Sequence, residues 1–209
     1  MNKLVVAGIG PGAPEFMSYS ALKAVKECDI LIAGRRHLEE FKSLAKETYA
    51  FGSDLEALIS FINSRTGDKK ICVAVSGDPG FYSLLDYLLK KLGRERLEVI
   101  PGISSFQYLF CKLVKPWKDF NLVSLHGKDA DLAAALKDKQ GAFFLTDRKN
   151  NPAHLAEQLV EQGLSELTMT VGENLSYEDE KITVGKPADI IKMSFSDLCV
   201  VVVEKSEGN

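Results

Sequence analysis

Residues 71–83, Ile71-Cys-Val-Ala-Val75 followed by Ser76-Gly-Asp-Pro-Gly-Phe-Tyr-Ser83, decide the fold class of this chain. The five apolar residues show no polar alternation, which is typical of a strand covered on both faces of a parallel sheet. The segment that follows, rich in glycine and proline, is typical of a loop. Leucines at helical spacing, stopped by Gly93, predict a helix over 81–92. The stretch therefore indicates a strand–loop–helix unit of an α/β protein.

The same alternation extends through the first half of the chain. Short apolar runs predict further strands at 4–7, 30–33 and 97–100. Helical spacing predicts helices over 18–28, 55–62 and 104–113. Helices of this length between strands imply crossover connections and hence a mainly parallel sheet.

A polar break, Lys115-Pro-Trp-Lys-Asp119, marks the expected domain boundary. Asn151-Pro152 predicts the start of a helix that ends before Gly163. Strands are expected at 121–125, 142–145, 167–171, 181–184 and 198–204, with fewer helices between them. The sequence therefore predicts two α/β domains, residues 1–115 with a mainly parallel sheet and residues 119–209 with a mixed sheet.

Composition excludes several classes of function. The chain has 209 residues, a formal net charge of −3 and a pI near 5.7, without the basic stripe that a nucleic-acid partner requires. Four scattered cysteines form no C-x-x-C pair, so no metal site is expected, and Cys72 and Cys199 are expected to be buried. No stretch approaches the roughly 20 apolar residues of a membrane helix, so a cytoplasmic protein without a membrane partner is expected.

The glycine loop Gly8-Ile-Gly-Pro-Gly-Ala13 resembles the dinucleotide fingerprint G-x-G-x-x-A after a strand. Two features argue against that interpretation. Pro11 and Pro14 lack the backbone N–H groups that would bind a pyrophosphate. Asp29 precedes the second predicted strand, whereas an acidic residue that binds ribose follows it. A tight turn explains any one of these glycines equally well.

Two further loops follow predicted strands, and ligands of open parallel sheets bind at the carboxyl ends of strands. Gly77 and Gly80 would allow the backbone to approach a ligand closely, and Phe81 or Tyr82 could pack on an adenine. Asp78 and Pro79 could instead simply start the next helix. In the third loop, Pro101-Gly-Ile-Ser-Ser105, a serine could cap the following helix. Three such loops exceed what turn formation alone requires.

Together, GIGPG, SGDPGFYS and PGISS resemble the motifs of the tetrapyrrole methyltransferase family. Further similarity runs nearly end to end, and includes VVAGIGPGAPEFMSYSALKAVKECDILIAG with Arg35-Arg-His-Leu38, then EVIPGISS, VSLHGK, LTDRKNNPAHLAEQL and VGENLSYEDEKI. The segments SLHG and GENLSYEDE resemble the branch of the family that methylates C5 of cobalt-precorrin-7, a corrin precursor of cobalamin.

This resemblance implies an S-adenosylmethionine-dependent C-methyltransferase, with the donor in a cleft between two α/β domains and S-adenosylhomocysteine as product. It also implies a homodimer, a small-molecule tetrapyrrole substrate, and a separate chain for methylation and decarboxylation at C15. Different acceptors, such as a diphthine precursor or an RNA ribose, remain alternatives within the family. A non-catalytic nucleotide- or tetrapyrrole-binding protein is the alternative from another class.

Candidate site residues follow from the loops and the resemblance. The expected cofactor-binding residues are Gly77, Asp78, Pro79, Gly80, Phe81, Tyr82, Ser104, Ser105, Thr146, Glu173 and Asn174. Because the substrate carries many carboxylates, cations are expected around it. The expected substrate-binding residues are Gly10, Pro11, Gly12, Arg35, Arg36, Lys128 and Arg148.

His126, near a predicted strand end, is the leading candidate for proton transfer because its side chain titrates near neutral pH. A structural hydrogen bond would explain a loop histidine equally well, and Glu15 or Asp78 are alternatives for the proton. His154 is expected to be structural. The acidic run Glu178–Glu180 is expected to be a solvated hairpin edge.

Overall fold

A computed structural model describes residues 3–44, 47–65, 67, 69–125 and 131–205. The chain forms two compact units, Met1–Ser104 and Ser105–Asn209, each built around its own five-stranded sheet. The predicted α/β fold class is confirmed, with a parallel sheet in the first unit and a mixed sheet in the second.

The first unit contains a wholly parallel sheet with the strand order β3-β2-β4-β1-β5. Its buried central strand β4 is the apolar run with which the sequence analysis began, and all five of its residues are buried. The strands are β1 (Leu4–Gly8), β2 (Ile30–Ala33), β3 (Glu47–Ala50), β4 (Ile71–Val75) and β5 (Leu97–Ile100).

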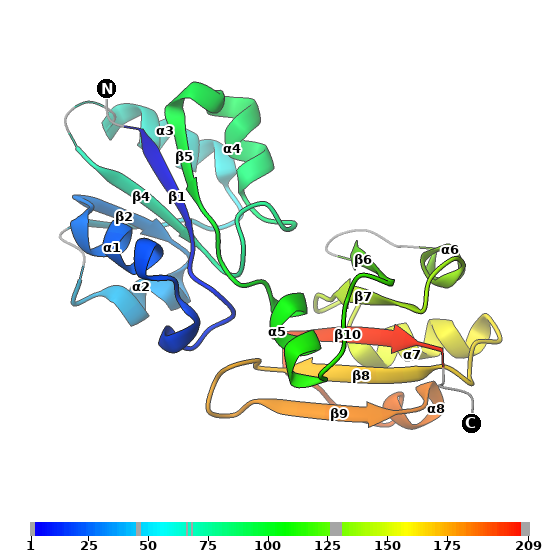
Figure 1. Cartoon of the computed structure of the whole chain (residues 1–209). Coiled ribbons are helices and arrows are strands. Elements are labelled where there is room, and N and C mark those ends of the chain that lie inside the picture. Colours follow the sequence, from blue (N-terminus) through cyan, green and yellow to red (C-terminus); the bar gives the residue numbers. More distant parts are fainter. Residues whose placement is uncertain (1–2, 45–46, 66, 68, 126–130, 206–209) are drawn as a thin grey trace. The chain divides into compact units, whose positions relative to one another are not determined.

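Helices cover both faces of this sheet (Figure 1). On one face, α1 packs its buried Ala21 and Val25 against small strand residues such as Ala74. On the other face, α3 and α4 pack larger residues such as Leu58 and Leu88 against the strands. The helices are α1 (Tyr19–Glu27), α2 (Arg35–Phe41), α3 (Leu55–Arg65) and α4 (Leu85–Leu92), with short 3-10 helices at Pro14–Phe16 and Arg94–Arg96.

The connections of β1 and β4 leave the sheet in opposite directions. From β1 the chain passes through α1 to β2 on one side, and from β4 it passes through α4 to β5 on the other. Neighbouring parallel strands whose connections diverge in this way form a topological switch point. Open α/β sheets bind ligands at the carboxyl ends of such strands.

The second unit has the strand order β6-β7-β10-β8-β9, in which only the β6–β7 pairing is parallel. Its central strand β10 is buried along its whole length. The strands are β6 (Phe120–Ser124), β7 (Gly141–Leu145), β8 (Thr168–Glu173), β9 (Lys181–Gly185) and β10 (Cys199–Glu204). The helices are α5 (Ser105–Lys112), α6 (Leu132–Leu136), α7 (Pro152–Glu161) and α8 (Pro187–Ile190).

The division between the units precedes α5, whereas the predicted domains, 1–115 and 119–209, are separated after this helix. Helix α5 packs with the second sheet because its large side chains contact it: the Phe106 ring lies 5.9 Å from that of Phe143. The Lys112 ammonium also lies 2.8 Å from the Glu180 carboxylate. Glu180 is therefore part of a partly buried ion pair, unlike the solvated edge expected for Glu178–Glu180.

Most predicted elements are confirmed within a few residues, but the loop after β4 is longer than predicted. Helix α4 begins at Leu85 and not at residue 81. Tyr82 has a φ of 47°, which a helix cannot accommodate, so the loop continues past Phe81. Four elements had not been predicted, namely α2, β3, α6 and α8.

Candidate functional site

The loops after β1 and β4 are hydrogen-bonded to each other at the switch point of the first sheet. The Gly77 N–H donates to the Gly10 carbonyl at 2.7 Å, and the Gly10 N–H donates to the Gly77 carbonyl at 3.4 Å. Gly10 and Gly77 have φ angles of 84° and 64°, which L side chains rarely adopt. Glycine is therefore required at both positions by the backbone conformation.

The loop after β5 packs against these two loops without side chains between them. A Cβ atom on Gly8 would lie 2.7 Å from the Gly102 nitrogen and 2.5 Å from the Gly77 oxygen. The Asp78 carboxylate accepts hydrogen bonds from the Gly102 N–H at 3.1 Å and from the Gly80 N–H at 2.8 Å. Asp78 thus ties two of the loops together.

Gly77 was expected to leave space for a ligand, but the structure gives a different reason for glycine there. A Cβ on Gly77 would lie 3.5 Å from the Ser104 Cα, which is an ordinary contact. Ser104 is buried, and Ser105 is the first residue of α5. The positive φ of Gly77 is by itself a reason for glycine at this position.

Aromatic residues follow at the exposed end of this loop. The Phe81 and Tyr82 rings meet edge to face with centroids 5.0 Å apart, and Tyr82 is 58% exposed. Pro79, earlier in the loop, is buried. Asp78 and Pro79 do not start the next helix, which begins at Leu85, so this part of the alternative interpretation is wrong.

Helix α2 places a hydrogen-bonded side-chain cluster at the same edge. Its first turn contains the exposed Arg35 and Arg36, followed by the buried His37. His37 Nε2 lies 2.6 Å from Ser76 Oγ, and His37 Nδ1 lies 2.9 Å from a Glu40 carboxylate oxygen. Arg36 Nη2 lies 3.3 Å from the same ring and 3.4 Å from Ser76 Oγ.

Burial lowers the pKa of His37 below its ordinary value. The hydrogen bond and charge of Glu40 raise this pKa, and the charge of Arg36 lowers it, but desolvation is the largest influence. The His37 ring is therefore held in the neutral form at neutral pH. No role was predicted for this histidine, because no helix was predicted over Arg35–Phe41 and the three-residue spacing from His37 to Glu40 indicates a pair only on a helix.

In the second unit, three of the expected cofactor residues lie at one end of the sheet. The Thr146 hydroxyl donates to the Cys199 carbonyl. Glu173 is buried; its Oε1 accepts from the Ser196 N–H at 2.9 Å, and Oε2 has no hydrogen-bond partner among the described residues. The Asn174 amide donates to Asp179 at 2.7 Å. Glu173 Oε2 lies 3.8 Å from the Lys181 ammonium, an ion pair too long for a hydrogen bond, so this oxygen can still accept one.

The predicted substrate-binding residues do not all lie in one place. Arg148 is exposed and donates to the Asp197 carboxylate from Nε at 3.0 Å and from Nη2 at 2.7 Å. His126 and Lys128 lie outside the described residues. Gly10, Pro11 and Gly12 lie with Arg35 and Arg36 at the carboxyl edge of the first sheet.

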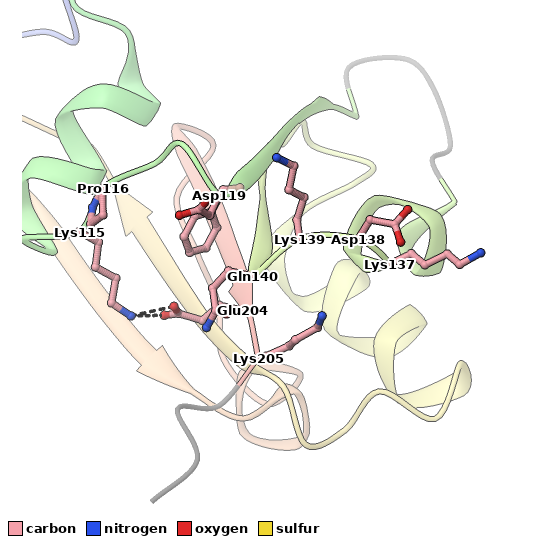
Figure 2. Close-up of a pocket in the computed structure, with 10 residues that line it drawn as sticks. Lys115, Pro116, Asp119, Lys137, Asp138, Lys139, Gln140, Glu204 and Lys205 are labelled. Carbon is pink, nitrogen blue, oxygen red and sulfur yellow. Dashed lines mark hydrogen bonds and ion pairs between the residues drawn. The ribbon is translucent and has the colours of Figure 1, made fainter.

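A pocket of about 690 Å³ opens elsewhere on the second unit (Figure 2). It lies at the end of the sheet where β7 begins and β10 ends, and Lys115 bridges to the buried Glu204 at 2.7 and 2.8 Å beside it. None of the predicted site residues lines it. Thr146 and Glu173 lie at the opposite end of the same strands.

Among the described residues, no helix is long and apolar enough to cross a membrane. The same part of the chain contains no cluster of His, Cys, Asp and Glu that could hold a metal ion. Cys72 and Cys199 are buried, as expected, and burial raises the pKa of the Cys72 thiol to about 12.

Residues 3–191 match the family of Tetrapyrrole (Corrin/Porphyrin) Methylases. The chain belongs to this family. It is 34% identical over 202 residues to the cobalt-precorrin-7 C(5)-methyltransferase of Salmonella typhimurium, covering 97% of this chain and 99% of that protein. It is 30% identical to the decarboxylating precorrin-6Y C(5,15)-methyltransferase of a Sinorhizobium species, over 98% of this chain and 50% of that protein.

A solved structure has the same fold as this tetrapyrrole methylase. The uroporphyrin-III C-methyltransferase of Thermus thermophilus, complexed with S-adenosylhomocysteine, superposes with a TM-score of 0.79 at 21% identity, covering 97% of this chain and 92% of that one. The predicted family is therefore confirmed by both sequence and fold.

Proposed function

We propose that this protein transfers the methyl group of S-adenosylmethionine to C5 of cobalt-precorrin-7 in cobalamin biosynthesis. The observation that carries this proposal is the similarity to the Salmonella enzyme, which extends over nearly the full length of both chains. Because the similarity is not confined to the glycine loops, it includes the parts of the chain that distinguish one acceptor from another.

The residues of this chain fit the methyl donor. At the switch point, the glycines of three loops let their backbones pack directly against one another, as at Gly8 and Gly102, and such a side-chain-poor edge suits a ligand held through main-chain contacts. In the second unit, the buried Glu173 Oε2 can accept a hydrogen bond from an N–H or O–H group of S-adenosylmethionine. The residues proposed to hold the donor are Gly77 to Tyr82, Ser104, Ser105, Thr146, Glu173 and Asn174.

The proposed substrate contacts are Gly10, Pro11, Gly12, Arg35, Arg36, Lys128 and Arg148. Arg35 and Arg36 are the strongest of these because both are exposed beside the glycine loops, where guanidinium groups can pair with the carboxylates of a corrin precursor. Arg148 is already paired with Asp197, so it would bind a carboxylate by exchanging this partner.

When bound, S-adenosylmethionine supplies an electrophilic methyl group on a sulfonium, which leaves as a neutral thioether. The protein's own contribution is positional. Loops fixed by the Gly10–Gly77 hydrogen bonds and by Asp78 hold the reacting molecules in a defined orientation. Orientation of this kind can lower a barrier by roughly 7–11 kcal/mol relative to a bimolecular reaction. We further propose that the enzyme is a cytoplasmic homodimer and that a separate chain acts at C15.

Transfer of a ¹³C-labelled methyl group tests this function. The enzyme is incubated with cobalt-precorrin-7 and donor labelled at the methyl carbon, and the product is examined by mass spectrometry and ¹³C NMR. One label per corrin, bonded to C5, is expected. An unlabelled corrin, or a label at another position, contradicts the proposal. Parallel reactions with a diphthine precursor and with RNA test the other acceptors of the family.

A further inference from the structure

Ser76, His37 and Glu40 form a continuous chain of hydrogen bonds whose direction is determined by the carboxylate. An ionised Glu40 only accepts hydrogen bonds, so His37 Nδ1, at 2.9 Å, carries the proton between them. In a neutral ring, Nε2 is then an acceptor, and the Ser76 hydroxyl at 2.6 Å donates to it. This is the arrangement of a hydroxyl that is ready to lose its proton to an imidazole.

The three hydrogen-bonded side chains lie close to the proposed reaction site. Ser76 directly precedes Gly77 at the carboxyl end of β4, beside the switch point, and it is exposed. His37 is only 6% exposed, so its ring cannot contact a substrate directly. The Ser76 hydroxyl is therefore the end of the chain that a bound molecule can reach.

We propose that Ser76, His37 and Glu40 form the proton relay of the methyl transfer, with the Ser76 hydroxyl as the group that contacts C5 of the corrin. This inference rests on the proposed function. It assigns the proton, which the sequence analysis placed on His126, to residues of the first unit.

Two π electrons of the corrin form the new C5–CH₃ bond, while the CH₃–S bond breaks and its electrons remain on sulfur. The C5–H bond then breaks, and its electrons return to the ring system. The released proton passes to Ser76 Oγ as the hydroxyl proton moves to His37 Nε2. The imidazolium ion formed is stabilised by Glu40 and later returns the proton to water.

The charged groups around the His37 ring are compatible with its role as a proton acceptor. The charged groups that act on His37 are Glu40 and Arg36, both from α2, while Ser76 from the end of β4 is neutral. Because burial holds the pKa of His37 below its ordinary value, the ring is an available acceptor at neutral pH. Arg36 Nη2, 3.4 Å from Ser76 Oγ, donates to that oxygen and so favours a hydroxyl proton that points to His37 Nε2.

The relay is tested with Ser76→Ala, Ser76→Thr and Glu40→Gln in the whole protein, with His154→Gln as a matched control. His154 also pairs with a glutamate three residues ahead, Glu157, but it is half-buried and lies in the second unit. We expect Ser76→Ala to lower kcat by at least about 10²-fold, with S-adenosylhomocysteine affinity unchanged. Ser76→Thr, which keeps the hydroxyl, restores most of kcat, and His154→Gln has no effect.

The pH profile separates a relay from a merely structural role. In the wild type, kcat falls at acidic pH with the same pKa that NMR measures for the His37 ring. Glu40→Gln removes a group that raises this pKa, so the acidic limb moves to lower pH. Wild-type kcat in Ser76→Ala, or an acidic limb that does not follow the His37 pKa, overturns the relay.

A second readout does not require turnover. In the ligand-free protein, ¹⁵N NMR of the His37 ring is expected to show the Nδ1–H tautomer, with an Nε2 shift that changes in Ser76→Ala. The other tautomer, or a ring indifferent to Ser76→Ala, contradicts the relay whatever the activity. An enzyme that methylates no corrin but has the expected His37 signals contradicts the proposed function instead.

Discussion

The two sheets differ in how their ends are closed on the side where site residues lie. In the first unit, Gly8, Gly77 and Gly102 bring three loops into backbone contact, and a single carboxylate, Asp78, ties two of them together. In the second unit, polar side chains close the end of the sheet: Thr146 bonds to the Cys199 carbonyl, and Glu173 accepts from the Ser196 N–H.

This difference determines which substitutions each region tolerates. At this end of the first sheet the loops meet through backbone atoms, so adding a side chain to one of the glycines is expected to destabilise it. At the corresponding end of the second sheet the hydrogen bonds come from side chains, so removing or neutralising one of these side chains is expected to destabilise it.

Gly102→Ala is expected to have the largest effect. Its Cβ would lie 2.7 Å from the carbonyl carbon of Gly8, and neither backbone can move without separating β1 from β5. We expect a loss of at least about 3 kcal/mol in the free energy of unfolding, measured by urea denaturation. Gly52→Ala is the matched control, because its Cβ meets no atom within 4 Å. Equal stabilities for the two variants would contradict the backbone packing described for this edge.

Gly77→Ala is expected to have a smaller effect on stability but a specific effect on binding. Its φ of 64° costs an L residue about 1–2 kcal/mol. Gly93→Ala bears the same kind of strain, with a φ of 80° and no neighbouring atom within 4 Å. Calorimetry with S-adenosylhomocysteine should show weakened binding only for Gly77→Ala. If both variants bind the compound as tightly as the wild type, the loop after β4 does not hold the donor.

Glu173→Gln tests the second region. Glutamine keeps an oxygen for the Ser196 N–H and removes a buried charge, so the free energy of unfolding should change by less than about 1 kcal/mol. If Oε2 accepts a hydrogen bond from the donor, S-adenosylhomocysteine binding should weaken by about tenfold. Unchanged affinity, measured by the same calorimetric titration, would remove Glu173 from the proposed site.

The smallest expected effect is on the pH dependence of stability. Burial lowers the pKa of His37, so as the pH falls below about 6.5 the unfolded chain takes up this proton before the folded one does. The free energy of unfolding therefore decreases as the pH falls from 6.5 to the pKa of His37 in the folded protein. Above pH 6.5 the stabilisation that comes from His37 being neutral is fully present.

This decrease should be missing in His37→Gln and retained in His154→Gln, by urea denaturation between pH 5 and 7.5. A wild-type curve parallel to that of His37→Gln across this range would show that the His37 pKa is not lowered.

Much of the fold was predictable because its signals are local. The unbroken apolar run of β4 and the Ser18 and Asn151 caps of α1 and α7 each depend on neighbouring residues alone. The end of the loop after β4 was not predictable, because the positive φ of Tyr82 depends on packing. Helix α2 was missed because its seven residues, Arg35–Phe41, carry four charges and too few apolar positions for a periodic signal.

The site was predictable only in part. The glycine loops were identified, but their mutual hydrogen bonds join residues some 67 positions apart, Gly10 and Gly77, and no local pattern shows them. The Ser76–His37 pair joins residues 39 positions apart through neighbouring strands in the same way. His37 follows β2 and Ser76 follows β4, so their contact can be inferred only once these two strands are known to be neighbours in the sheet.

Amide NMR can show, residue by residue, whether the glycine edge of the first unit holds the methyl donor, as we propose. S-adenosylhomocysteine is titrated into uniformly ¹⁵N-labelled protein while backbone amide signals are followed. Saturable shifts are expected to be largest at Gly77, Gly80 and Tyr82, and small at Gly93 and Gly163. Saturable binding that leaves the amides of residues 77–82 unperturbed, or no binding at millimolar ligand, would contradict the account.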